Sequence, residues 1–328
     1  MLRFLKKQWF LLGMIGAVLL ATAFPQIGKS DGPLRANDLA NIGVSLVFFF
    51  HGMTLSVENL KNGLLSWKVH AAVQAMTFIA FPLMMFGFCW FAGTFLPAGL
   101  ILGFYFLGVL PSTISSSVAM VAIGRGNVPA AIFNASFSNL IGIFLTPLLV
   151  NIFAETTGET LPLGETILNL FALLFLPFLL GQVARIFFKK YVPIIKPFIN
   201  ILDSLVILLI VFSSFADAVA QGLWHEHGWT ILFETFIGAS IILAFALAIS
   251  WCLAKVLRFN KEDEITTVFC GSKKTLASGI PIAKIVFGSA ALAGDINLGL
   301  LVLPIMFYHQ LQIFVCSILA NRYAKRSQ

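Results

Sequence analysis

The chain has 328 residues, of which 59% are hydrophobic and only 11% are charged, and it contains 34 phenylalanines. A soluble domain of this length cannot bury that much apolar surface, so we expect an integral membrane protein and exclude soluble enzymes and binding domains. The formal net charge is +7. The basic residues fall in short loops rather than in a stripe with aromatic residues, which argues against a nucleic-acid partner.

Ten apolar segments can cross a bilayer, since a membrane helix needs about 20 apolar residues. They are predicted near residues 9–27, 37–57, 69–92, 99–123, 128–152, 164–187, 200–220, 229–256, 264–288 and 295–320. The first segment also resembles a signal peptide, because basic residues precede it and Ala21-Thr22-Ala23 lies near its end. We interpret it as an uncleaved first span.

The loops between these segments alternate in charge. One side carries 16 of the 21 basic residues: Arg3, Lys6, Lys7, Lys61, Lys68, Arg125, Arg185, Lys189, Lys190, Lys196, Lys255, Arg258, Lys261, Arg322, Lys325 and Arg326. Positive loops stay in the cytoplasm. We therefore expect a multi-pass protein of the bacterial inner (plasma) membrane with both termini cytoplasmic.

Two of the ten segments are interrupted by polar residues and helix breakers. The fourth reads GVLPSTISSSVAMVAIGRGN, in which Pro111 precedes five hydroxyl residues: Ser112, Thr113, Ser115, Ser116 and Ser117. The ninth contains FCGSKKTLASGIP, in which Ser272, Lys273, Lys274 and Thr275 lie between Gly271 and Gly279. Broken backbone at membrane depth survives only inside protein or beside a water-filled cavity.

The interrupted segments hold matching places in the two halves of the chain, because each is the fourth of five. Five spans per half give the halves opposite orientations, so we predict inverted repeats over residues 9–152 and 164–320 of a single membrane unit. Paired breaks of this kind indicate a transporter with its site near the midplane. Ordinary kinked helices are the alternative, and Pro82, Pro177 and Pro304 fit that description.

A lysine at the bilayer centre costs about 2.5–3.5 kcal/mol on insertion scales, so Lys273 and Lys274 are expected to face a wet, protein-lined cavity or an acid. The acids most embedded in the predicted spans are Asp203, Asp217 and Glu234. The sequence does not choose among them. Adjacent helical residues point about 100° apart, so the two lysines need not share one environment.

These residues resemble the bile acid:sodium symporter family. The likeness rests on Gly124-Arg125-Gly126-Asn127, on Thr146-Pro147, and on CGSKKTLASGIPIAK followed by Phe307-Tyr308-His309. The ninth-span motif is similar to the divergent SBF-like branch, which includes the seventh vertebrate member. The resemblance implies an all-α fold of ten transmembrane helices, in which discontinuous spans 4 and 9 cross at the midplane. It implies a core of spans 3–5 and 8–10 and a panel of spans 1, 2, 6 and 7.

The resemblance also implies candidate ion ligands. The family's polar pair in the fourth span matches Ser116 and Ser117, the fifth-span ligands correspond to Asn134, Ser138 and Asn139, and the third-span glutamine aligns near Thr77 and Gln74. Sodium is therefore placed at Ser116, Ser117, Asn134 and Ser138. The ninth span departs from the family, because its glutamate, glutamine and asparagine become Phe269, Lys273 and Lys274.

We interpret Lys273 as a built-in cation in the space of a sodium ion, because sodium wants oxygen ligands and a carboxylate is lost. Lys274, or Lys273 when deprotonated, is then available to an anionic substrate, and proton coupling becomes an alternative to sodium coupling. Both lysines could instead only fix the crossing by hydrogen bonds. His309, with Gln310 or Gln312, faces the core in this interpretation, His51 is a weaker candidate, and Asp217 could line the cleft.

No catalytic triad, Walker loop, dinucleotide loop or metal-ligand spacing occurs in the sequence, so we expect neither an enzyme nor a cofactor. Our first hypothesis is a secondary transporter of a small organic anion, coupled to sodium or protons. The alternative is a non-cycling membrane regulator or scaffold of ion homeostasis that keeps a transporter fold. The substrate, the coupling ion, the direction and the oligomeric state are not encoded in any motif.

Overall fold

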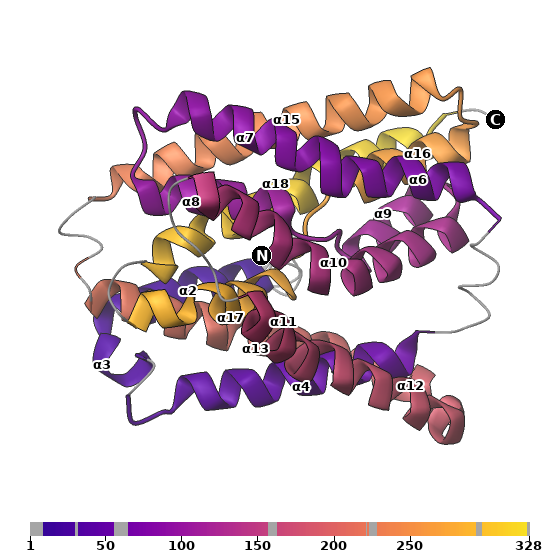
Figure 1. The fold of residues 1–328 in the computed structure, drawn as a ribbon. Helices are drawn as coiled ribbons and strands as arrows, with labels where there is room; N and C mark the ends of the chain where they lie inside the picture. The colour runs from indigo at the N-terminus through magenta and orange to yellow at the C-terminus, as the bar shows by residue number, and fades with distance from the viewer. Residues whose placement is uncertain are drawn as a thin grey trace. The chain divides into compact units, whose positions relative to one another are not determined.

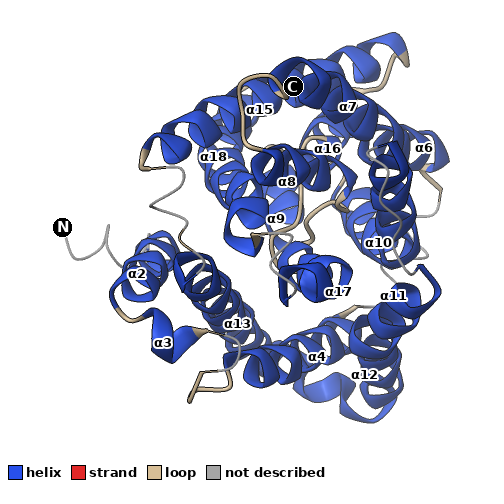
Figure 2. Ribbon diagram, turned by 60° about the vertical axis from the view of Figure 1, so that its left-hand side comes forward, coloured by secondary structure: helices blue, strands red, loops and turns tan. Residues whose placement is uncertain are grey.

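The structure is a computed structural model that describes residues 9–29, 32–55, 65–156, 163–220, 222, 228–292 and 297–326. The basic residues Arg3, Lys6, Lys7 and Lys61, which support the predicted orientation, lie outside these ranges. Every regular element in the described ranges is a helix, and no strand occurs among them (Figure 2). The predicted all-α class is therefore confirmed.

Six helical runs in the described residues are long and apolar enough to cross a membrane. They are Trp67–Ala92, Val128–Phe153, Leu163–Ile195, Ile201–Ala220, Thr230–Val256 and Leu298–Ala324. Shorter apolar helices cover Leu12–Ala23, Ala98–Val109 and Gly279–Gly288. The chain is thus a multi-pass membrane protein, while the count of ten spans and the inverted repeat stay predictions.

The chain divides into two compact units, each of which is assembled from separate stretches of sequence. Unit 1 contains residues 1–55, 164–231 and 280–302, and unit 2 contains residues 56–163, 232–279 and 303–328. The helices of unit 1 are α2 (Trp9–Ala23), α3 (Pro25–Gly28), α4 (Ala36–Thr54), α11 (Leu163–Leu170), η2 (Phe171–Phe175), α12 (Leu176–Phe188), η3 (Lys189–Tyr191), α13 (Val192–Ala220) and α17 (Gly279–Leu292).

Unit 1 is held together by close approach of α4 and α12. A Cβ added at Gly181 would lie 1.9 Å from the carbonyl oxygen of Phe49, and one added at Gly52 would lie 2.1 Å from that of Phe178. Only glycine allows main chains to come this near. The end of α4 is then capped from α12, because the side-chain amide of Gln182 donates to the carbonyl of Gly52 over 2.7 Å.

Unit 2 contains the breaks of both interrupted segments, whereas α17, which follows the ninth-span break, belongs to unit 1. Its helices, several of which are labelled in Figure 1, are α6 (Trp67–Ala75), η1 (Met76–Ala80), α7 (Phe81–Ala92), α8 (Ala98–Val109), α9 (Ser115–Ile123), α10 (Val128–Thr156), most of α15 (Thr230–Val256), α16 (Lys261–Gly271) and most of α18 (Leu298–Ala324). The predicted fourth span is split into α8 and α9, with Pro111 in the gap. The predicted ninth span is split into α16 and α17, with both lysines in the gap.

The cytoplasmic turn predicted at Gly124-Arg125-Gly126-Asn127 is a packed part of unit 2. Arg125 adopts a left-handed conformation with φ of 60°. The side-chain amide of Asn127 donates to Asp263 over 2.9 Å, and its main-chain N–H donates to the hydroxyl of Thr266 over 2.9 Å. The turn after α9 is therefore tied to the start of α16, which brings the two interrupted segments together.

Candidate functional site

The non-helical residues of the fourth span are anchored by hydrogen bonds to α10 and α16. The main-chain N–H of Ser112 donates to the hydroxyl of Ser138 over 3.0 Å, and its own hydroxyl donates to the carbonyl of Cys270 over 2.7 Å. The carbonyl of Ser112 accepts from the side-chain amide of Asn139 over 2.7 Å. Ser112, Ser138 and Cys270 are fully buried. The break is thus a satisfied polar structure inside protein.

The two breaks are joined directly by their main chains. The N–H of Thr275 donates to the carbonyl of Pro111 over 3.0 Å. Nearby, the hydroxyl of Ser278 donates to the side-chain oxygen of Asn139 over 3.0 Å. Both contacts lie within unit 2. The structure therefore brings the predicted fourth-span, fifth-span and ninth-span residues into one site.

Helix α18 supplies two anchors to the ninth-span break. The side-chain amide of Gln312 accepts from the main-chain N–H of Lys274 over 2.9 Å and donates to its carbonyl over 2.8 Å. The hydroxyl of Tyr308 donates to the carbonyl of Ser272 over 2.6 Å. Both side chains are fully buried. Neither was a predicted binding residue, and Gln312 was named only as a possible neighbour of His309, although a lone amide in an apolar span was a usable signal.

The side chain of Lys274 ends among three main-chain carbonyls. Its Nζ lies 2.9 Å from the carbonyl oxygen of Thr77, 2.6 Å from that of Gly108 and 2.7 Å from that of Leu110. The ring of Phe81 closes the remaining side, with its centroid 4.2 Å from Nζ. We call the three carbonyls the carbonyl cage. An ammonium group has three N–H donors, so all three are used.

The side chain of Lys273 has a different environment, although it too is 0% exposed. Its Nζ donates to the carbonyl of Ser116 over 2.8 Å, and the ring centroid of Phe269 lies 6.0 Å away. His309 is within electrostatic range of this ammonium. Among the described residues no carboxylate forms an ion pair with either lysine. Lys273 is therefore the less saturated of the two cations.

The predicted sodium ligands are occupied by internal hydrogen bonds. The hydroxyl of Ser117 donates to the carbonyl of Phe269 over 3.4 Å, and Gln74 donates to the side-chain oxygen of Asn134 over 3.2 Å. Ser138 already accepts from Ser112. Phe269, which the resemblance matches to the family's glutamate, is fully buried in an apolar cluster. Among the described residues, the hydrogen-bond partners of these side chains include no carboxylate.

The remaining candidates differ in exposure and location. Ser115 is exposed at the start of α9, whereas Ser116 is half-buried and donates weakly to Thr113 over 3.4 Å. Asp217 belongs to unit 1, where its carboxylate interacts electrostatically with Lys284. His51 is in the same unit, within electrostatic range of Asp203. Asp217 and His51 are thus engaged by partners of their own unit.

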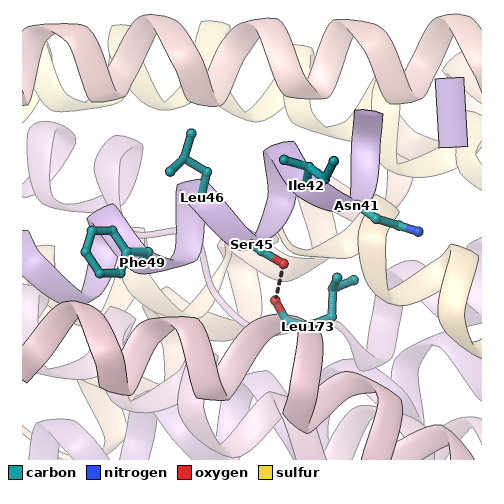
Figure 3. Close-up of a pocket in the computed structure, with 6 residues that line it drawn as sticks. All are labelled: Asn41, Ile42, Ser45, Leu46, Phe49 and Leu173. Carbon is teal, nitrogen blue, oxygen red and sulfur yellow. Dashed lines mark hydrogen bonds between the residues drawn. The ribbon is translucent and has the colours of Figure 1, made fainter. Parts of the chain in front are cut away.

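A shallow groove of about 450 Å³ lies on unit 1 between α4 and η2 (Figure 3). It is lined by Asn41, Ile42, Ser45, Leu46, Phe49 and Leu173. The hydroxyl of Ser45 donates to the carbonyl of Leu173. Four residues after Leu173 lies Pro177, which has no N–H to donate to this carbonyl. The lining is mostly apolar, and none of its side chains is charged, so the groove offers no charge to an ionic solute.

Comparison with known proteins gives a consistent result over nearly the whole chain. The family model described as the SBF-like CPA transporter family matches residues 8–325. The chain is 43% identical to the uncharacterized protein PA2026 of Pseudomonas aeruginosa over 99% of this chain and 95% of that protein. It is 39% identical to the protein named "Putative symporter YfeH" of Escherichia coli K12, over 97% of this chain and 93% of that protein. It is 31% identical to sodium/bile acid cotransporter 7 of Rattus norvegicus, over 96% and 92% of the two chains.

Proposed function

Because the chain belongs to the SBF-like CPA transporter family, and because two of its relatives are named as a putative symporter and a sodium/bile acid cotransporter, we propose that it moves a small organic anion by secondary active transport. The driving force in this proposal is a sodium or proton gradient. One relative carries bile acid and sodium in its name, which supports an organic anion and a cation as the transported pair.

The observation that carries the proposal is the ammonium of Lys273 beside the start of α9. It is fully buried yet has a single carbonyl acceptor, that of Ser116, among the described residues. Helix α9 begins without a side-chain cap, so the first N–H groups of Ser115, Ser116 and Ser117 point out of the helix unused by a cap. Free N–H groups, hydroxyls and a cation together favour an anion.

Alternating access fits the division into two compact units. Predicted spans 1, 2, 6 and 7 fall in unit 1, and spans 3–5, 8 and 10 fall largely in unit 2. This grouping supports the proposed panel and core, with α17 grouped with the panel side. In the proposal these two bodies rearrange during transport, while the two interrupted segments stay joined within the core.

Proton coupling and sodium coupling make different demands on the site. The loss of a carboxylate at Phe269 weakens a sodium site, and Lys273 with His309 nearby offers groups that bind protons. Sodium coupling would have to use the hydroxyl and amide oxygens of Ser116, Ser117, Asn134 and Ser138 alone. We propose the proton as the more favourable partner, with sodium as the rival to be tested.

The deciding experiment uses purified protein in liposomes and in detergent. Uptake of a bile salt, an aryl sulfonate and a dicarboxylate is measured under an imposed proton or sodium gradient, with wild type beside Lys273→Gln. We expect gradient-driven uptake in wild type and loss of it in Lys273→Gln. An anion at 100 times its Kd should stabilise wild type by about 2.7 kcal/mol in a melting assay, and should not stabilise the variant.

The test also separates the alternatives. No uptake of any anion under either gradient, together with no change in melting temperature, would refute the transport proposal and favour a non-cycling regulator. The observation that favours a non-cycling regulator is the dense hydrogen-bond network that joins the two breaks, because it would hold the protein in one conformation. Stabilisation of wild type by sodium chloride but not by potassium chloride would favour sodium coupling.

We also propose that the chain lies in the inner membrane of a bacterium with both termini in the cytoplasm. The basic residues in its loops support this orientation. A green fluorescent reporter fused after Gln328 should fluoresce, because it folds in the cytoplasm. A matched fusion to alkaline phosphatase, which is active only in the periplasm, is the control. An active phosphatase fusion together with a dark fluorescent fusion would show the opposite orientation.

A further inference from the structure

The three carbonyls around Lys274 lack main-chain N–H partners, and the sequence explains why in each case. Gly108 is in the last turn of α8, and Leu110 follows its end, so no helical N–H reaches their carbonyls. Pro111, directly after them, cannot supply an N–H and cannot continue the helix. The end of a helix also carries partial negative charge, which attracts a cation.

The third carbonyl of the cage is freed by a wider helical turn. In η1 the N–H of Phe81 bonds to the carbonyl of Met76, five residues back, instead of to that of Thr77. The next candidate donor for Thr77 in this pattern is residue 82, which is a proline and has no N–H. The carbonyl of Thr77 is therefore left without a main-chain partner and turns to Lys274. Pro82 thus does more than kink a helix.

The cage is closed to water. Thr77, Phe81, Leu110 and Lys274 are all 0% exposed. Three carbonyls without partners in such a place would each carry an uncompensated desolvation cost. A primary ammonium group satisfies all three at once, and an aromatic face adds a further attraction for its charge. A neutral amine has two N–H groups and would leave one carbonyl unpaired.

From this geometry we propose that the carbonyl cage is a site for a small monovalent ammonium ion and that the chain supplies the ion itself, as the side chain of Lys274. Lys274 is a positioning residue in this assignment: it fixes the end of α8 against η1 and carries no transported species. The ammonium available to a solute is then that of Lys273. The assignment does not depend on which solute or coupling ion is transported.

The proposal predicts chemical rescue. The variant Lys274→Ala keeps Cβ and lacks three carbons and the ammonium, which together equal n-propylammonium. Its melting temperature should lie at least about 5 °C below that of wild type, because three buried carbonyls lose their donor. Adding n-propylammonium chloride during solubilisation should restore at least half of the loss, and ethylammonium and methylammonium should restore progressively less.

Two controls make the rescue specific. Tetramethylammonium chloride at equal concentration has the same charge and no N–H donor, so it should restore nothing. Lys273→Ala, melted under the same conditions, should not respond to n-propylammonium, because in the described part of the chain the Nζ of Lys273 contacts one carbonyl and not a cage of three. Equal stabilisation of Lys274→Ala by both salts, or an equal response in Lys273→Ala, would overturn the proposal.

A second variant keeps the proposal testable if Lys274→Ala yields no folded protein. Lys274→Met has nearly the same length without the charge, and its melting can be followed through a fluorescent C-terminal fusion in crude detergent extract. We expect it to melt below wild type by a similar amount. A Lys274→Met protein as stable as wild type would show that the carbonyls need no cation. None of these readouts uses transport, so their failure leaves the proposed function standing.

Discussion

The side-chain amide of Gln312 offers a quantitative test of how the ninth-span break is held. It forms two hydrogen bonds with the main chain of Lys274, at 2.9 and 2.8 Å, and it is fully buried. The variant Gln312→Met keeps the length and volume of the side chain. It removes the donor and the acceptor together, so the N–H and the carbonyl of Lys274 are left without partners.

The cost can be worked out from these two groups. Each buried main-chain group that loses its partner costs about 1–3 kcal/mol, which gives a loss of about 2–6 kcal/mol in the free energy of unfolding. At about 2 °C per kcal/mol for a chain of this size, the melting temperature should fall by about 4–12 °C. The measurement is thermal unfolding of the purified protein in detergent, read by tryptophan fluorescence.

A matched control lies on the same helix. The side-chain amide of Asn321 bonds to the carbonyl of Ser317 over 2.8 Å, but this residue is exposed. Asn321→Ala should change stability by no more than about 0.5 kcal/mol. If Gln312→Met melts within 1 °C of wild type while the control behaves as expected, the reasoning about buried main-chain groups at the break is refuted.

Two further predictions address other parts of the molecule. Gly181→Ala places a Cβ 1.9 Å from the carbonyl oxygen of Phe49 and should lower the free energy of unfolding by about 1–3 kcal/mol. The control Gly16→Ala meets nothing within 4 Å and should not lower it. Equal melting temperatures of the two variants would contradict the close packing of α4 and α12. Glu264 is 2% exposed and lies 2.8 Å from Lys255. Glu264→Gln should lower the free energy of unfolding by only about 1–2 kcal/mol, because the half-exposed lysine left behind can be hydrated. An unchanged unfolding midpoint of Glu264→Gln in a denaturant titration would show that this ion pair adds nothing.

The interruptions of the two spans could be predicted from sequence because their causes are local. Pro111 removes a donor and blocks the preceding turn wherever it is placed, and Gly271 and Gly279 weaken the helix on either side of the lysines. The structure ends α8 at Val109 and α16 at Gly271 accordingly. Apolar length likewise predicted membrane helices, since a bilayer imposes the same requirement on any sequence.

The partner of each lysine could not be predicted, because it depends on distant carbonyls. Adjacent residues diverge by about 100° only within a helix, and the chain is not helical at the two lysines. The carbonyl of Thr77 is free only because the turn around it is widened and Pro82 follows. That combination is invisible until the third, fourth and ninth segments are placed together. From the sequence we assign the built-in cation to Lys273, and the saturated surroundings of Lys274 could not be predicted.

Saturation is the property that separates the two adjacent charges. A transport site has to release its ligand, so a group that carries substrate or protons must have hydrogen-bonding capacity that its own fold does not consume. Lys274 gives all three of its donors to carbonyls that would otherwise be unpaired, and moving it would expose that cost in full. Among the described residues, Lys273 gives one donor to Ser116 at the start of α9 and retains two. The pair thus combines the fixed charge of Lys274, which makes the broken backbone tolerable, with the adjacent charge of Lys273, which remains able to bind. Replacing Lys273 should therefore affect the response to ligand more than stability. Replacing Lys274 should affect stability more than the response to ligand.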